Sequence, residues 1–159
     1  PVAFMEPIAP HIAAQKQGQR MQVDRLTGFT SGVLMQGANF TLVEGAGGWR
    51  VPINERETLA DLAVDLSIPV ILVVGMRLGC INHTLLTVEA IARDGLELAG
   101  WVANCIDPQM AEQAANVATL QHRIQAPMLG LVPHLSDINE ASERVEACQT
   151  FLDLDALLR

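Results

Sequence analysis

Residues 69–83 read Pro-Val-Ile-Leu-Val-Val-Gly-Met-Arg-Leu-Gly-Cys-Ile-Asn-His: an apolar run, a glycine-containing turn, and the start of a helical sequence. The run is continuously apolar rather than alternating, which predicts a strand covered on both faces. Three further runs of this kind lie at 40–43, 98–104 and 128–132. Strands covered on both faces are typical of parallel sheets, so these runs indicate an α/β fold.

The segments between and around these runs have helical patterns. We expect helices at 24–36, 58–66, 82–93, 108–124 and 143–158. Pro108 suits the first turn of a helix, and Asp94-Gly95 suits the end of one. The order of strands and helices predicts a three-layer α/β fold with a mostly parallel sheet. Residues 1–10, with three prolines, are expected to be extended or loop, and residues 1–159 are assigned to one domain.

Composition narrows the class of protein. The chain has 159 residues, of which 50% are hydrophobic and 18% charged, and its net charge is -8. An acidic chain without a basic patch is repelled by nucleic acids and anionic membranes, so we expect neither as a partner. No apolar run approaches the ~20 residues of a membrane span, and no signal peptide is evident, so we expect a cytoplasmic location. The three cysteines have no CxxC spacing, which favours neither a disulfide framework nor a zinc site.

Ligands of open α/β sheets bind at the carboxyl ends of the strands, so the residues after each apolar run are candidates for chemistry. Glu44, Gly45, Ala46 and Gly47 follow the first run. A carboxylate followed by small residues suits a Mg²⁺ ion and the phosphates of a nucleotide. A solvated Glu44 in an ordinary glycine turn is the alternative.

The second run leads into Gly79, Cys80 and Asn82, where exposed N–H groups at a helix start can bind an anion. The alternative is a plain turn with Asn82 as the helix cap. Cys80 has the position of an activated thiol, but a small buried residue is the favoured interpretation.

The third run ends at Asn104 and Cys105, and the Asn104 amide could pair with a purine edge or simply form a turn. After the fourth run, the loop from Pro133 to Glu140 could lie against a nucleotide base or ribose. A surface turn explains its residues equally well.

Five of these stretches together resemble one family, the ATP-dependent dethiobiotin synthetases. They are EPIAPHIAA at 6–14, VEGAGGW at 43–49, PVILVVGMRLGCINHTLLT at 69–87, LAGWVAN at 98–104 and APMLGLVPHL at 126–135. The block GMRLGCINH is the most specific of them, whereas VEGAGG is shared with amidating enzymes of cobalamin synthesis. The resemblance implies a sheet of the P-loop nucleotide-hydrolase type.

The resemblance also implies roles for individual residues. Those implied to contact ATP are Glu44, Gly45, Ala46, Gly47, Asn104, Cys105, Pro133, His134, Leu135 and Glu140. Glu44 is implied to be the Mg²⁺ ligand as well. Cys105 and His134 depart from the residue types usual in the family. Gly79, Cys80 and Asn82 resemble the helix start that binds the substrate carboxylate across a homodimer interface.

One family feature is absent from this chain. The motif GxxxxGK[ST] does not occur, and the only lysine, Lys16, is followed by Gln17. We therefore expect a chain that lacks the family's N-terminal strand, P-loop and helix. The catalytic lysines are among the absent residues, so no catalytic residue is identified and the activity of this chain is in doubt.

For the complete enzyme, the resemblance implies that the ureido ring of dethiobiotin is closed from 7,8-diaminononanoate and CO₂ with ATP and Mg²⁺. Two alternatives remain open at this point. One is a related ATP-dependent, amide-forming ligase of the cobalamin type. The other is a non-catalytic module, without a P-loop, that dimerises or binds a partner.

Overall fold

A computed structural model describes residues 2–136 and 138–157 of the chain. The chain divides into two compact units, Pro1–Ile68 and Pro69–Arg159, and each is described by itself. The assignment of all 159 residues to one domain stays a prediction. Among the described residues, no helix combines the length and the apolar character that crossing a membrane requires.

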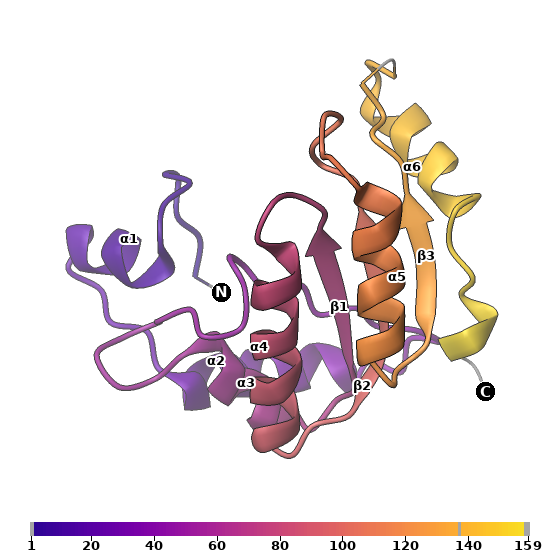
Figure 1. Cartoon of the computed structure of the whole chain (residues 1–159). Helices are drawn as coiled ribbons and strands as arrows, with labels where there is room; N and C mark the ends of the chain where they lie inside the picture. The colour runs from indigo at the N-terminus through magenta and orange to yellow at the C-terminus, as the bar shows by residue number, and fades with distance from the viewer. Residues whose placement is uncertain (1, 137, 158–159) are drawn as a thin grey trace. The chain divides into compact units, whose positions relative to one another are not determined.

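The second unit contains a parallel sheet of three strands in the order β1-β2-β3 (Figure 1). The strands are β1 (Val70–Gly75), β2 (Leu98–Asn104) and β3 (Met128–Val132). Between them run the helices α4 (Cys80–Arg93) and α5 (Gln113–Arg123). The predicted strands at 98–104 and 128–132 are confirmed, and the run at 70–74 extends by one residue.

Side chains of the sheet alternate between two apolar clusters. Trp101 and Ala103 of β2, both fully buried, pack with Cys80 of α4 and Leu120 of α5. Val102 points into the second cluster, together with Leu129 and Val132 of β3. Residues of α6 (Ala141–Gln149) and of the segment after it pack against this cluster. Both faces of the sheet thus carry an apolar cluster, which agrees with the continuous apolar character of the strands, although Val73 of β1 is 60% exposed.

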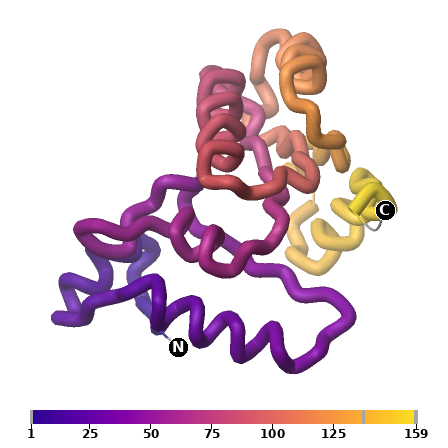
Figure 2. Tube along the Cα trace, turned by 90° about the horizontal axis from the view of Figure 1, so that it is seen from below, coloured from indigo at the N-terminus to yellow at the C-terminus, as the bar shows by residue number. Residues whose placement is uncertain are grey.

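The first unit is helical and has its own small core. Its helices are α1 (Pro10–Lys16), α2 (Val23–Leu34) and α3 (Leu59–Leu66). After α2 the chain turns back through residues 35–58 and enters α3, which packs beside α2 (Figure 2). The buried core residues are Ala14, Met21, Val23 and Ile53.

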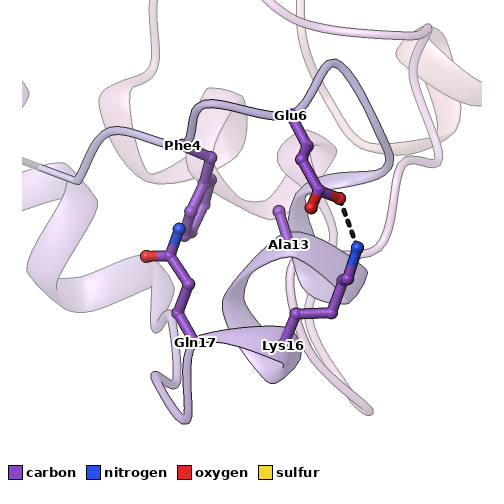
Figure 3. A pocket seen from close by; sticks show the side chains of 5 residues that line it. All are labelled: Phe4, Glu6, Ala13, Lys16 and Gln17. Atoms are coloured by element: carbon purple, nitrogen blue, oxygen red, sulfur yellow. Dashed lines mark hydrogen bonds and ion pairs between the residues drawn. The ribbon is translucent and has the colours of Figure 1, made fainter.

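The segment before α1 folds back against that helix. Phe4 packs against the core of the first unit, and Glu6 forms an ion pair with Lys16 in the last turn of α1 (Figure 3). The hollow that these residues line has a volume of only about 30 Å³. A space of that size holds a water molecule rather than a ligand.

Asn54 connects the loop before α3 to the start of α2. Its Nδ2 atom donates to the carbonyl oxygen of Met21 over 2.9 Å and also to the Glu57 carboxylate. Its Oδ1 atom accepts the backbone N–H groups of Arg56 and Glu57 at 2.9 and 3.0 Å. Glu57 in turn accepts the backbone N–H of Val23, the first residue of α2, at 3.3 Å.

Three predictions about secondary structure are wrong. The run at 40–43 is irregular rather than a strand, and Phe40 and Leu42 are 64% and 70% exposed. A strand needs a ladder partner, and this run has none among the described residues. Pro108 lies in a turn, because α5 begins only at Gln113.

The third wrong prediction concerns the C-terminal end of the chain. The helix expected at 143–158 stops at Gln149, and the described residues after it include only the short 3₁₀ turn Asp155–Leu157. Residues 158 and 159 lie outside the described residues. The opening, expected to be extended or loop, is irregular from Val2 to Ala9 as predicted, and Pro10 starts α1, a position where the missing N–H of proline does no harm.

Candidate functional site

The carboxyl ends of the three strands form one straight edge of the sheet. Gly75, Asn104 and Val132 are the last residues of β1, β2 and β3, and they are paired in register across the sheet. The three polar or glycine-containing segments that sequence reasoning singled out in this unit therefore leave the sheet side by side. Their placement at this edge is confirmed, whereas their roles as ligand contacts stay predictions.

Backbone hydrogen bonds continue past the strand ends and hold this edge together. Met76 donates its N–H to the Asn104 carbonyl oxygen over 2.7 Å, and Ile106 donates to the same oxygen over 3.0 Å. Cys105 donates its N–H to the carbonyl oxygen of Val132 over 2.9 Å. The chain after β2 is thus fixed to its neighbours on both sides before it turns away.

The Asn104 side chain is half-buried at the centre of this edge. In the described part of the chain, its amide forms no hydrogen bond with protein. An amide both donates and accepts, so its free groups match the mixed donor and acceptor pattern of a purine edge. The residue therefore fits the predicted base contact.

Cys105 turns its thiol into the protein. Its side chain is 4% exposed and belongs to the cluster that contains Trp101. Burial raises the pKa of the Cys105 thiol above its ordinary value, because the thiolate loses its hydration. Any contact of Cys105 with a ligand must therefore use its backbone.

The residues of the loop after β3 differ in which of their atoms a ligand could reach. His134 is exposed, and its Nδ1 atom lies 3.3 Å from the carbonyl oxygen of Cys105. Pro133 is half-buried, and Leu135 packs against the cluster of Val102 and Leu129. The leucine side chain is therefore part of the core and leaves only its backbone for a ligand.

Glu140 lies farther along the same loop and is exposed at the start of α6. Its carbonyl oxygen accepts the backbone N–H of Arg144 at 3.1 Å, so its backbone serves the helix. Only its side chain is left for a nucleotide.

The turn after β1 ends in a helix start of the expected kind. Gly79 is the N-cap of α4, with φ of 91°, a conformation that favours glycine. Cys80 is 3% exposed, which confirms a small buried residue there. Asn82 is the third residue of the helix and is exposed, so the alternative that made it the N-cap is wrong. The Cys80 N–H donates to the Arg77 carbonyl oxygen over 3.0 Å, so among the described residues the first-turn N–H groups left to attract an anion are those of Ile81 and Asn82.

In the first unit, the glycine-rich segment after 40–43 is exposed. Gly47 and Gly48 have φ of 79° and 111°, so this backbone conformation requires glycine. Glu44 is exposed, and in the described part of the chain its carboxylate has no hydrogen bond or ion pair. Glu44 does not end a buried strand, so burial does not by itself demand a partner for it.

A free carboxylate beside small residues fits the donor set of a Mg²⁺ ion bound to phosphates, which needs one or two protein carboxylates. No group of three or more His, Cys, Asp or Glu side chains gathers anywhere among residues 2–136 and 138–157. Glu44 is therefore available for a cation that takes most of its ligands from phosphate and water.

The sequence did not predict the hollow of about 310 Å³ that Glu44 helps to line. Its other lining residues are Phe29, Thr30 and Val33 of α2 and residues 41–43. The apolar residues of α2 were the only feature of the sequence that could have indicated this hollow.

Known proteins resemble this chain over nearly its whole length. Residues 1–142 match the model of a family described as an AAA domain. A protein from Cellvibrio japonicus named ATP-dependent dethiobiotin synthetase BioD is 57% identical over 158 residues, which are 99% of this chain and 67% of that protein. The chain belongs to the dethiobiotin synthetase family.

Other proteins named dethiobiotin synthetase are similarly close to this chain. Proteins of the same name from Pseudomonas paraeruginosa and Chromohalobacter salexigens are 56% and 50% identical and match 89% and 86% of this chain. The chain spans 62% and 61% of the length of these two relatives. The family is one of ATP-dependent ligases by name, and its fold is the α/β type with a parallel sheet seen in the second unit.

Proposed function

We propose that this chain is the nucleotide- and substrate-binding part of a ligase that closes the ureido ring of dethiobiotin. The substrates are 7,8-diaminononanoate, CO₂ and ATP. The observation that carries this proposal is the 57% identity to a dethiobiotin synthetase over 99% of the chain. The row of strand ends at Gly75, Asn104 and Val132 supports it, because ligands of parallel sheets bind at such an edge.

The reaction has three steps. One amine of the diamine adds to CO₂ and loses a proton to give a carbamate. A carbamate oxygen attacks the γ-phosphorus of ATP, and ADP leaves. The second amine then attacks the carbamoyl carbon and loses a proton, the C–O bond to phosphate breaks, and phosphate leaves with the ring closed. Phosphorylation is needed because a carbamate oxygen is otherwise a poor leaving group.

The residues of this chain bind and orient these reactants. Asn104 and the loop from Pro133 to Glu140 contact the adenine and ribose, and Gly45, Ala46 and Gly47 present backbone N–H groups to the γ-phosphate. Glu44 holds Mg²⁺, which neutralises negative charge on the phosphates when it is bound. Holding reactants in position accounts for much of the rate of such transfers.

The start of α4 binds the carboxylate of the diamine. Support comes from the first-turn N–H groups beyond Gly79 and from the exposed amide of Asn82. We propose that this helix start serves the active site of a second copy in a homodimer. Leu78, which precedes Gly79, is 96% exposed, so its side chain is accessible to a second copy of the chain.

The test joins this chain to the segment of the Cellvibrio japonicus relative that the match leaves uncovered. We expect the joined protein to form dethiobiotin with ATP and Mg²⁺, whereas the 159-residue chain, which has no GxxxxGK[ST] motif, should not. Glu44→Gln should lower kcat of the joined protein by about 100-fold or more while leaving its circular dichroism unchanged. Glu55→Gln, at an exposed carboxylate that forms an ion pair with Arg20, is the matched control and should leave kcat unchanged.

Three outcomes would count against the proposal. A joined protein that folds but makes no dethiobiotin would favour a different ligase or a binding module. Turnover by the 159-residue chain alone would contradict the need for the absent motif. An unchanged Mg²⁺ dependence in Glu44→Gln would remove Glu44 from the metal site.

A further inference from the structure

Among the described residues, His134 has a hydrogen-bond partner at one ring nitrogen only. Its Nδ1 atom lies 3.3 Å from the carbonyl oxygen of Cys105, a residue 29 positions earlier in the chain. A carbonyl oxygen has no proton and can only accept a hydrogen bond. The Nδ1 atom must therefore carry the proton, and a neutral ring then keeps its lone pair on Nε2.

The carbonyl group of Cys105 needs this donor. Beyond Asn104 the strand ladder ends, and among the described residues no backbone N–H donates to the Cys105 oxygen. The contact with His134 is partly buried, and a carbonyl that is withdrawn from water without a partner is costly. The imidazole thus supplies the hydrogen bond that a backbone N–H of a neighbouring strand would donate if the ladder were longer.

The contact joins two segments that sequence reasoning placed at the nucleotide. Asn104 and Cys105 end β2, and His134 begins the loop after β3. The backbone bond from Cys105 to Val132 fixes the base of that loop, and the His134 contact fixes it two residues farther along. Two successive bonds from one residue define the direction in which the loop leaves the sheet.

We propose that His134 is a positioning residue, which holds the loop after β3 against the end of β2 by donating its Nδ1–H to the Cys105 carbonyl. The consequence for nucleotide binding rests on the proposed function, whereas the donor role does not. The proposal identifies which of the two ring nitrogens matters, and this can be tested by substitution. Asparagine places an amide N–H near the position of Nδ1, whereas glutamine reaches the position of Nε2.

The first measurement uses the 159-residue chain labelled with ¹⁵N and records histidine ring nitrogens at about pH 8, where imidazoles are ordinarily neutral. The chain has four histidines, and the spectrum of His134→Asn identifies the signals of His134 by their loss. We expect the Nδ1–H tautomer, which is the less common one in free histidine. The Nε2–H tautomer, or an average of the two, would overturn the proposal.

The second measurement compares His134→Asn with His134→Gln by the ¹⁵N relaxation of the amides of Leu135 and Ser136. We expect the asparagine variant to keep these amides as rigid as in the wild type, and the glutamine variant to make them more mobile. Equal mobility in the two variants would contradict a role for Nδ1. His122→Gln in α5 is the control and should leave both amides unchanged.

The third measurement is the KM for ATP in the joined protein described above. His134→Gln should raise this KM by about 3- to 10-fold, the factor expected from one lost hydrogen bond, with little change in kcat. His134→Asn should stay near the wild-type KM, and a rise equal to that of the glutamine variant would overturn the positioning role. If the joined wild-type protein is inactive, the proposed function fails, and the tautomer and relaxation measurements still decide the role of His134.

Discussion

Gly130 in β3 lies directly against the backbone carbonyl of Phe151, so closely that a Cβ atom at this position would overlap the carbonyl oxygen. The chain after α6 is held there by two backbone contacts, a bridge between Gly130 and Leu152 and a hydrogen bond of 2.7 Å from Asp153 to the Leu129 carbonyl. Backbone cannot move aside as a side-chain tip can. The absence of a side chain at Gly130 therefore allows the C-terminal segment to cover this face of the sheet.

Gly130→Ala should lower the free energy of unfolding of the second unit by about 1–3 kcal/mol, because the added methyl group displaces the segment around Phe151. Urea unfolding followed by circular dichroism measures the change. Gly75→Ala is the matched control in the same sheet, since its Cβ meets only the side-chain end of Ile106, which is 45% exposed. Equal losses in the two variants would show that the contact with Phe151 does not matter.

Asn54→Ala should destabilise the first unit by about 1–3 kcal/mol, since it leaves two backbone N–H groups and the Met21 carbonyl without their partner. Asn54→Asp separates the two sides of this network. It keeps the oxygen that accepts from Arg56 and Glu57 and loses the donor to Met21.

Amide hydrogen exchange at Arg56 and Glu57 checks the Asn54 network. We expect the fastest exchange in Asn54→Ala. Asn54→Asp should exchange more slowly than Asn54→Ala, because it keeps the accepting oxygen, but faster than the wild type, because it places a second carboxylate against that of Glu57. Asn116→Ala in α5 should have little effect on these amides, because the Asn116 side chain donates to the carbonyl oxygen of Glu112, the N-cap of its own helix in the second unit. Unchanged exchange in Asn54→Ala would mean that other contacts hold this loop.

The cysteines should differ in their reaction with a thiol reagent at about pH 8, where thiolate is the reacting species. Cys80 and Cys105 are buried, and the raised pKa of Cys105 lowers its thiolate fraction further, whereas Cys148 is half-buried. We expect Cys148 to react first in the native protein and all three to react in denaturant. Cys148→Ser should abolish the fast phase, and a fast phase that survives this change would show that the core around Trp101 opens readily.

The proposed site shared between two copies predicts complementation. In the joined protein, Asn82→Ala should raise the KM for the diamine far more than the KM for ATP. Mixing this variant with Glu44→Gln should restore activity, because some heterodimers would contain one active site with both wild-type residues. No recovery under proven subunit exchange would confine Asn82 to the surface of its own helix.

Apolar pattern alone predicted the strands of the sheet because both faces of the sheet carry an apolar cluster. The run at 40–43 has the same pattern but, among the described residues, no ladder partner, and a single sequence does not reveal whether a partner is present. Helix starts were harder to predict. Gln113 begins α5 five residues after Pro108, because a proline tolerated in a first helical turn is equally tolerated in a loop.

The sequence predicted which segments lie at the candidate site. It did not predict which side chains of those segments are accessible or which residues they contact. The rule that ligands bind at the carboxyl ends of strands located Asn104, Cys105 and His134 at one edge. Which side chains point inward there depends on register and packing, so the burial of Cys105 and Leu135 was not predictable. The contact from His134 to Cys105 depends on the path of a loop, for which the sequence has no periodic signal.

The position of β2 between two partners has a consequence for how the protein opens. Its amides and carbonyls bond to β1 on one side and β3 on the other, so neither neighbour can separate from the sheet without leaving β2 attached to the remaining one. Fluctuations that release a single element therefore spare the central strand, and its amides should exchange with solvent only through global unfolding of the unit. Asn104 therefore lies at the end of the strand whose amides should exchange most slowly. The loops that begin at Met76 and Pro133 can fluctuate around Asn104 at a small fraction of the free energy of unfolding of the unit.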